Sequence, residues 1–269
     1  MAEEMPGRIH IVGAGPGAVD LLTLKAHALI RGAEVLLHDD LVPEQILALA
    51  PATAQIINVG KRCGQRANSQ EKINALMIWH AQNGSEVVRL KSGEPGIFGR
   101  LGEELDALRR AGIPFEVVPG ITAVAAAAAA AGVSLTDRRK ASTLVMATAH
   151  YARSDAVSFC SHATDPARTT LAVYMPGPDY GRTAQQLIAS GLDANTPCVL
   201  VSNAARSTEQ VCSMTISDLP FAAGIAAPAV LIVGEVARKR RFKPEFEMIS
   251  NFLEEKYEPV GNRDPHSPY

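Results

Sequence analysis

The fold of this chain can be argued outward from the segment Lys91-Ser92-Gly93-Glu94-Pro95-Gly96-Ile97-Phe98-Gly99-Arg100. It follows a strand-like run at 86–90 and precedes a helix-like run that begins near 102. Its three glycines and one proline indicate a bare backbone loop at the carboxyl end of a strand. In an open α/β sheet, ligands sit at this place. Because glycine carries no Cβ, the loop offers N–H and C=O groups at close range, which suits an adenosine or amino-acid moiety.

The composition of the 269 residues is that of a folded protein, with 47% hydrophobic and 20% charged residues. A net charge of −2 argues against a nucleic-acid coat protein or a polybasic membrane binder. The four cysteines are widely spaced and form no C-x-x-C, which disfavours a zinc site and favours a reduced setting. No signal-peptide pattern is present, and the longest apolar stretch, 124–133, is too short to span a bilayer. We therefore expect a cytoplasmic protein without a membrane or nucleic-acid partner.

Strand-like and helix-like runs alternate over the first half of the chain. This alternation predicts a mostly parallel sheet covered by helices. The alanine-rich run at 123–131 has no bulky side chains, so it either packs tightly against the sheet or lets another group approach the helix closely. We expect strands at 8–12, 34–38, 55–59, 86–90 and 115–118, and helices at 21–30 (capped by Asp20), after Pro43, at 69–83, 103–111 and 123–131.

The pattern changes after the polar, basic stretch 134–140, which is the expected domain junction. One clear helix, at 183–190, lies among strand-like runs, and this predicts a second α/β domain with more antiparallel character. The expected fold class is therefore α/β, with domains at 1–137 and 138–241. Residues 242–269 are expected to form a peripheral helix and a mobile tail. The strand-like runs of the second domain are 143–147, 171–174, 199–202, 210–214 and 229–233.

The glycine turn at 13–17 allows a second interpretation. Gly13-x-Gly15-x-x-Ala18, with Asp39 at the end of the second strand, loosely fits a dinucleotide fingerprint and would favour an NAD-dependent oxidoreductase. Pro16 argues against it, because proline removes an N–H from the turn that should hold a pyrophosphate. No clear acid or base for hydride transfer follows later in the chain.

A series of motifs in fixed order is the stronger signal. The motifs are Gly13-Ala14-Gly15-Pro16-Gly17, Asp20-Leu21-Leu22-Thr23-Leu24-Lys25, His38-Asp39-Asp40-Leu41-Val42, Val59-Gly60-Lys61-Arg62, Arg89-Leu90-Lys91-Ser92-Gly93-Glu94-Pro95, Ile97-Phe98-Gly99-Arg100, Val118-Pro119-Gly120-Ile121-Thr122-Ala123 and the ending at 228–236. With them, from about residue 9 to residue 236, the chain resembles the tetrapyrrole methylase family. The resemblance is closest to the members that methylate uroporphyrinogen III.

This resemblance implies two α/β domains with S-adenosyl-methionine held in the cleft between them, usually in a homodimer. The implied activity is C-methylation of uroporphyrinogen III to precorrin-2, which feeds sirohaem and cobalamin synthesis, with S-adenosyl-homocysteine as the second product. The alternatives are a methylase of a later precorrin, the NAD-dependent oxidoreductase, and a non-catalytic relative that binds a tetrapyrrole or the cofactor.

The resemblance also assigns roles to residues. Asp39 matches the proton acceptor, and a carboxylate there could also stabilise the cationic pyrrole carbon. Lys61 matches the proton donor. Alternatively, Asp39 caps a turn with Asp40 and Lys61 is a solvated loop residue. The implied cofactor contacts are Pro16, Ser92, Gly93, Glu94, Ile97, Thr122, Ala123, Met175 and Ala204.

A substrate with eight carboxylates requires a basic cleft. The candidates for this role are Arg62, Arg100 and Arg138, with Arg66, Arg139 and Lys140 as further ones, and each could instead be an ordinary surface residue. The histidines carry no ligand spacing, so no metal is assigned.

The chain departs from the family pattern in its loops. The family segment reads Gly-Gly-Asp-Pro-Phe where this chain has Ser92-Gly93-Glu94-Pro95-Gly96, and Leu101, Ala149 and Ala204 replace glycines. A replaced glycine that needs φ > 0 would cost about 1 kcal/mol or more. Together the departures could shift the cofactor affinity, widen the substrate pocket or indicate a different tetrapyrrole.

Overall fold

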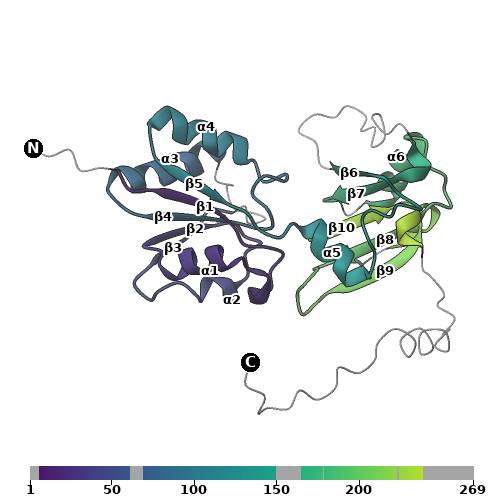
Figure 1. The fold of residues 1–269 in the computed structure, drawn as a ribbon, viewed down its shortest axis with the longest axis horizontal. Helices are drawn as coiled ribbons and strands as arrows, with labels where there is room; N and C mark the ends of the chain where they lie inside the picture. Colours follow the sequence, from purple (N-terminus) through teal and green to yellow (C-terminus); the bar gives the residue numbers. More distant parts are fainter. Residues whose placement is uncertain (1–5, 61–68, 150–164, 178, 223, 239–269) are drawn as a thin grey trace, which may run out of the picture. The chain divides into compact units, whose positions relative to one another are not determined.

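The computed structural model describes residues 6–60, 69–149, 165–177, 179–222 and 224–238 (Figure 1). Several sequence predictions lie outside these residues: Lys61, Arg62, Arg66 and the helix expected near the end of the chain. In the described part, two five-stranded sheets are formed, the first by residues 9–118 and the second by residues 143–233. The predicted α/β class is confirmed, and the domain division at residue 137 stays a prediction.

The first sheet is parallel throughout and has the strand order β3-β2-β4-β1-β5. Its central strand β4 is buried along its whole length and lies between β2 and β1. Because parallel strands end at the same edge of a sheet, the loops that follow β1, β2, β4 and β5 come together there. The strands are β1 (Ile9–Gly13), β2 (Val35–His38), β3 (Gln55–Asn58), β4 (Val87–Lys91) and β5 (Phe115–Val118).

Helices cover both faces of the first sheet (Figure 1). On one face, Ala26 and Ile30 of α1 and Ile46 of α2 pack with strand residues such as Leu36 and Leu90. On the other face, the apolar sides of α3 and α4 form a second cluster with alternate residues of the same strands. The helices are α1 (Leu24–Arg31), α2 (Glu44–Leu47), α3 (Gln70–Gln82) and α4 (Leu101–Ala111).

The start of α1 differs from the prediction. Val19–Leu21 form a short 3-10 helix, and Leu22 is extended, so the chain does not enter an α-helix after Asp20. Thr23 caps α1 instead, because its hydroxyl accepts the hydrogen bond of the Ala26 N–H. By contrast, the start of α3 agrees with the helix expected from residue 69: Ser69 is its cap, and the Ser69 hydroxyl accepts the hydrogen bond of the Lys72 N–H.

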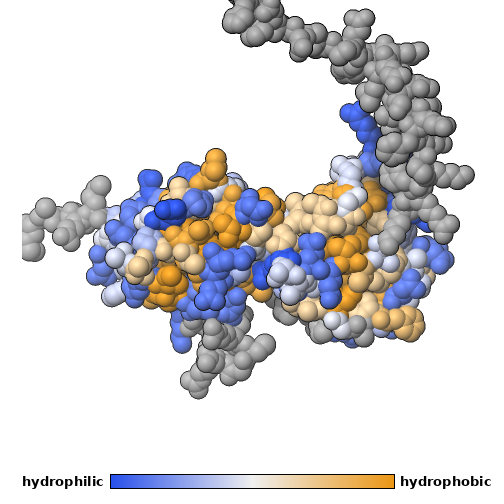
Figure 2. Space-filling model, turned by 90° about the horizontal axis from the view of Figure 1, so that it is seen from below, coloured by the Kyte–Doolittle hydropathy of each residue, from blue (hydrophilic) through white to orange (hydrophobic). Residues whose placement is uncertain are grey.

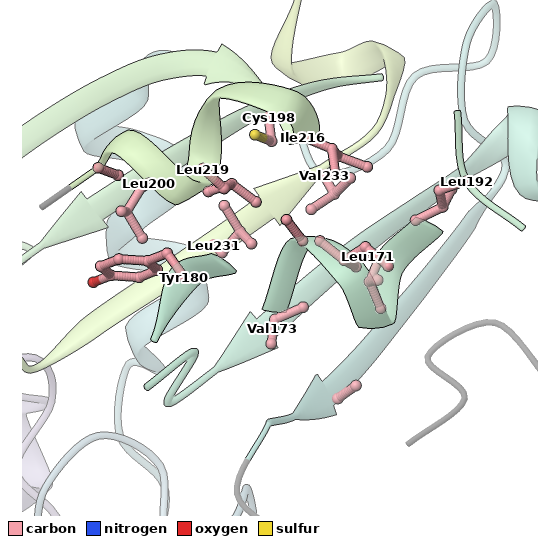
Figure 3. Packing of buried hydrophobic residues seen from close by; sticks show 14 residues of the cluster. Leu171, Val173, Tyr180, Leu192, Cys198, Leu200, Ile216, Leu219, Leu231 and Val233 are labelled. Carbon is pink, nitrogen blue, oxygen red and sulfur yellow. The ribbon is translucent and has the colours of Figure 1, made fainter. Parts of the chain in front are cut away.

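The second sheet has the strand order β6-β7-β10-β8-β9. Its β6–β7 pair is parallel and its other three pairs are antiparallel, which confirms the predicted antiparallel character. One face packs against α6 and the 3-10 helix η3, and Figure 3 shows labelled members of this cluster pointing toward one another. The elements are β6 (Thr143–Thr148), β7 (Thr169–Tyr174), α6 (Tyr180–Ala189), β8 (Pro197–Ser202), β9 (Gln210–Thr215), η3 (Ile216–Phe221) and β10 (Ala229–Val233), with short 3-10 turns η2 (Pro166–Arg168) and η4 (Glu235–Ala237).

The alanine helix α5 (Ala123–Ala131) packs against the other face of this second sheet. Val124, Ala127 and Ala128 are buried in one cluster with residues of β7, β8 and β10. Alanine side chains are short, so the helix can lie close to the strands without a void. Tight packing therefore explains the composition of α5, although the sheet involved is the one that follows it in the chain.

The surface carries large apolar residues among polar ones. Leu24, Trp79 and Phe221 are exposed, and the face seen in Figure 2 mixes hydrophobic and hydrophilic residues. Within the described ranges, none of the helices combines the length and the apolar character that crossing a bilayer requires.

Candidate functional site

Four glycines lie against one another at the carboxyl edge of the first sheet. Gly15 and Gly93 exchange two backbone hydrogen bonds, of 3.2 and 2.8 Å between N and O. A Cβ on Gly120 would lie 2.3 Å from the Gly93 carbonyl oxygen, and one on Gly13 would lie 2.6 Å from the Gly120 nitrogen. At Gly13 and Gly120 these contacts leave no room for a side chain, so the loops after β1, β4 and β5 form one backbone surface.

Glu94 ties two of these loops together. Its Oε1 accepts a hydrogen bond from the Gly96 N–H at 3.0 Å, and its Oε2 accepts one from the Gly120 N–H at 2.8 Å. Glutamate is longer than the aspartate of the family segment, and the Glu94 side chain spans from the loop after β4 to the loop after β5. Direct contact between Glu94 and the cofactor stays a prediction.

Gly93 lies beside Ala123, the first residue of α5. Gly93 has φ +70°, and the nearest atom to a Cβ built there is the Ala123 nitrogen, 3.9 Å away. Unlike Gly13 and Gly120, the buried Gly93 could thus take an added Cβ without a steric clash. The half-buried Ser92 precedes it in the loop.

Thr122 joins the loop after β5 to the second sheet. Its hydroxyl lies 2.5 Å from the Tyr174 hydroxyl at the end of β7, and it does not cap α5. Burial raises the pKa of Tyr174, so this phenol stays protonated at neutral pH. The Phe98 ring lies 4.9 Å from the Tyr174 ring. Three predicted cofactor residues pack against the same cluster as Tyr174: Ile97, Ala123 and Ala204.

Left-handed backbone surrounds the predicted cofactor residues. Met175, itself one of them, has φ 47°, and Ala204 stands between Asn203 (φ 50°) and Ala205 (φ 61°). Such conformations cost free energy outside glycine and gather at functional sites. The remaining non-glycine residues of this kind in the described ranges are Phe98 and Arg100, which flank Gly99.

The replaced family glycines do not carry the expected strain. None of the described positions Ser92, Leu101, Ala149 and Ala204 has a positive φ. The cost foreseen for a side chain in left-handed backbone therefore does not arise at them.

A buried charge network lies behind Asp39. Arg89, 2% exposed, donates from Nη2 to Asp39 Oδ1 at 2.5 Å and from Nε to Glu104 Oε1 at 3.1 Å. Lys91 Nζ donates to the same Glu104 oxygen at 3.0 Å, and burial lowers the pKa of Lys91. The neighbouring Asp40 accepts a separate hydrogen bond, from the Asn58 side-chain amide, at 2.8 Å. The network fixes a partly exposed carboxylate at the sheet edge.

The predicted substrate residues are less well assembled. Lys61 and Arg62 lie outside the described residues. Arg100 forms an exposed ion pair with Glu103, 2.7 Å between Nη2 and Oε2. Arg138 is exposed, and its carbonyl accepts from Arg168. Their roles in substrate binding stay predictions.

The sequence matches one protein family over most of its length. The family is described as Tetrapyrrole (Corrin/Porphyrin) Methylases, and the match covers residues 8–220. The chain belongs to this family. Membership confirms the predicted family and, with it, the methyltransferase class of enzyme. It leaves the NAD-dependent alternative without support.

Two relatives of this methylase show how the match extends. A siroheme synthase of Cronobacter sakazakii is 44% identical over 233 residues, which are 86% of this chain and 49% of that protein. The chain thus spans about half the length of such relatives. A uroporphyrinogen-III C-methyltransferase of Paracoccus denitrificans is 40% identical over 256 residues, 91% of this chain and 89% of that protein.

Solved structures of the family have the same fold. A uroporphyrin-III C-methyl transferase from Thermus thermophilus, complexed with S-adenyl homocysteine, aligns with a TM-score of 0.74 at 36% identity. The alignment covers 86% of this chain and 94% of that one. A cobalt precorrin-4 methyltransferase aligns with a TM-score of 0.76 at 28% identity, over 86% and 96% of the two chains.

Three residues of this site have no role in the sequence analysis: Arg89, Tyr174 and Arg206. A charged residue inside an apolar strand run is the signal that could have identified Arg89. No local pattern points to Arg206, because its partners Pro16 and Leu41 lie 190 and 165 residues away in the chain.

Proposed function

We propose that this methylase transfers methyl groups from S-adenosyl-methionine to pyrrole carbons of uroporphyrinogen III, giving precorrin-2 and S-adenosyl-homocysteine. The observation that supports it most is the Asp39 carboxylate, held by the buried Arg89 at the edge where the glycine loops meet. The similarity to the Paracoccus denitrificans methyltransferase over nearly its whole length supports the choice of substrate.

The residues at the loop edge fit the cofactor. Backbone groups of the Gly93 loop, the Thr122 hydroxyl and the exposed Met175 side chain combine polar and apolar contacts. A molecule with a nucleoside and an amino-acid part needs both kinds. The residues that would hold it are Pro16, Ser92, Gly93, Glu94, Ile97, Thr122, Ala123, Met175 and Ala204. When bound, S-adenosyl-methionine supplies a methyl group that its sulfonium already activates.

The chain's own part in the reaction is alignment and removal of a proton. The fixed loops hold the two reactants in line, which lowers the entropic part of the barrier. The pyrrole ring becomes cationic when one of its carbons uses a π electron pair to bond the methyl group, and the Asp39 carboxylate stabilises that charge. Arg89 occupies Oδ1, and among the described residues none donates a hydrogen bond to Oδ2. Oδ2 therefore accepts the proton that leaves, and the ring system returns to neutrality.

Basic residues would bind the carboxylates of the substrate. Arg62, Arg100 and Arg138 are proposed for this role and Lys61 as proton donor, on the strength of the family pattern. A guanidinium suits a carboxylate because its fork of N–H groups matches the two oxygens. The exposed Arg100–Glu103 pair is weak in water, so Arg100 can exchange Glu103 for a substrate carboxylate at little cost.

A later precorrin is the second candidate substrate. The fold likeness to a cobalt precorrin-4 methyltransferase favours it. The loop also differs from the family segment, because Ser92 replaces a glycine and Gly96 replaces a phenylalanine, and these changes could suit a different tetrapyrrole. The activity of the longer siroheme synthases as a whole is not proposed for this chain.

Anaerobic incubation with uroporphyrinogen III and methyl-labelled S-adenosyl-methionine tests the proposal. We expect a product that carries two labelled methyl groups and is heavier by two CH2 units, because each methylation also releases a proton, with the absorption spectrum of precorrin-2. Methylation of a later precorrin alone would favour the second candidate. Tight binding of S-adenosyl-homocysteine without methylation of any tetrapyrrole would indicate a non-catalytic relative.

The oligomeric state and location are predicted from the family and the composition. We propose a homodimer in the cytoplasm. Sedimentation equilibrium of the purified chain, with an expected mass of two copies, tests the first, and fractionation of cells tests the second.

A further inference from the structure

We propose that Arg206 is a positioning residue that fastens the loop of Ala204 to the two loops that carry Pro16 and Asp39. This inference rests on the proposed function for the effect of Arg206 on catalysis. The connection between the loops is itself a property of the fold. Arg206 lies in the β8–β9 connection of the second sheet, whereas the other two loops leave strands of the first sheet.

Two hydrogen bonds make the connection. Arg206 Nε donates to the Pro16 carbonyl at 3.1 Å, and Nη2 donates to the Leu41 carbonyl at 2.7 Å. Pro16 is in the glycine turn after β1, and Leu41 follows Asp39 by two residues. One guanidinium therefore holds both the cofactor-side turn and the turn of the proposed proton acceptor.

The environment of Arg206 is unusual for a cation. Burial lowers its pKa, and among the described ion pairs none includes it. A half-buried guanidinium without a carboxylate partner is costly unless its N–H groups are used. Carbonyl oxygens from two separate loops match its rigid fork of donors, which a lysine ammonium would not do equally well.

Gly17 makes room for this side chain. A Cβ on Gly17 would lie 2.8 Å from Arg206 Nε and 3.2 Å from its Cγ, and Gly17 has φ +138°. The glycine turn thus has the shape that admits the guanidinium.

The loop of Arg206 is itself firmly held in the second sheet. The Asn203 N–H donates to the Pro228 carbonyl at 2.9 Å, and the Ala205 N–H donates to Glu209 Oε2 at 2.7 Å. Asn203 and Ala205 both adopt left-handed backbone, which only surrounding contacts can maintain. A fixed loop that presents a charged fork can position its neighbours rather than follow them.

Loss of the guanidinium should act on two quantities. The cofactor affinity should fall because Pro16 and Ala204 are no longer held together, and kcat should fall because the turn of Asp39 is released. Removal of hydrogen bonds from a charged donor should raise the dissociation constant of S-adenosyl-homocysteine about tenfold.

The experiment compares Arg206→Met with Arg206→Lys and with Arg110→Met. Arg110 is an exposed residue in the last turn of α4, and no side-chain partner is found for it among the described residues, so its variant controls for loss of an arginine. Hydrogen exchange of the amides at 15–18 and 39–42 is measured without ligand. Calorimetric binding of S-adenosyl-homocysteine, kcat and thermal unfolding are measured on the same proteins.

In Arg206→Met we expect faster hydrogen exchange at both segments and about tenfold weaker binding of S-adenosyl-homocysteine. We expect this variant still to unfold cooperatively. Arg206→Lys should lie between Met and wild type, because an ammonium can keep one of the two bonds. Unchanged exchange in Arg206→Met, or equal behaviour of the Lys and Met variants, would overturn the proposal. If wild type bound no S-adenosyl-homocysteine, the proposed function would fail while hydrogen exchange still decided the fastening.

Discussion

Arg89 and Asp39 are 50 residues apart in the chain, yet Arg89 Nη2 lies 2.5 Å from Asp39 Oδ1. Arg89 stands opposite Leu37 in the β2–β4 pairing, so its side chain reaches along the sheet to the first residue beyond β2. It is buried, whereas the Asp39 side chain is 32% exposed. The pair thus presents a fixed carboxylate to whatever binds at the sheet edge.

Asp39→Asn should separate catalysis from cofactor binding. The amide oxygen can still accept from Arg89, but it cannot accept the proton from the methylated substrate. We expect turnover to fall about a hundredfold or more, with the affinity for S-adenosyl-homocysteine almost unchanged. A methyl-transfer assay measures the turnover, and calorimetry measures the affinity for S-adenosyl-homocysteine. Asp106→Asn, on the exposed side of α4, is the control. Full turnover in Asp39→Asn would remove Asp39 from the mechanism.

Glu104→Gln should destabilise the fold. Glu104 is fully buried and accepts from both Arg89 and Lys91, so its neutralisation leaves the buried Lys91 without its carboxylate partner and Arg89 with Asp39 alone. We expect the free energy of unfolding to fall by about 3 kcal/mol, measured by urea denaturation. The neighbouring Glu103→Gln, which breaks only an exposed pair, should change little. Equal midpoints for the two variants would contradict the importance of the buried network.

Gly93→Val should fold and lose cofactor binding. The new side chain projects toward Ala123, whose nitrogen would lie 3.9 Å from the added Cβ, and its left-handed backbone costs about 1–2 kcal/mol. Gly102→Ala is the matched control, because Gly102 lies in α4 with no atom within 4 Å of the added methyl group. The control should bind normally and be slightly more stable. Normal S-adenosyl-homocysteine binding by Gly93→Val would show that the cofactor does not lie against this loop.

His80 should make the fold sensitive to acid. Burial lowers the pKa of His80 in the folded chain, so the unfolded chain takes up the proton first as the pH falls. The free energy of unfolding should therefore decrease as the pH drops through about 6.5, the ordinary pKa of histidine. Urea midpoints at pH 7.5 and 5.5 measure the decrease, which should be smaller in His80→Gln than in wild type or in His27→Gln. An identical decrease in all three proteins would rule out His80 as a source.

Much of the secondary structure could be predicted from local pattern. The bounds expected for β5, α5 and β10 agree with the structure, because each is an apolar run between proline or glycine residues. Such signals are local, since they depend on side-chain periodicity and on which residues tolerate a turn. The predicted start of α1 was wrong because aspartate and threonine are both good caps. Only the backbone path decides between Asp20 and Thr23.

The contacts of Glu94 and Arg206 could not be predicted in this way. Glu94 was expected beside the cofactor, and the fold joins its carboxylate to Gly96 and Gly120. The partners of Arg206 are distant in the chain, and no spacing rule connects them.

The sequence by itself determined the alternation of strands and helices, the glycine loops at strand ends and, through ordered motifs, the family. Only the tertiary structure decided which loops touch, that the alanine helix packs on the second sheet, and that a buried arginine holds Asp39. The physical reason is that backbone preference acts over a few neighbouring residues. Packing and charge pairing depend instead on which surfaces the folded chain brings within a few ångströms.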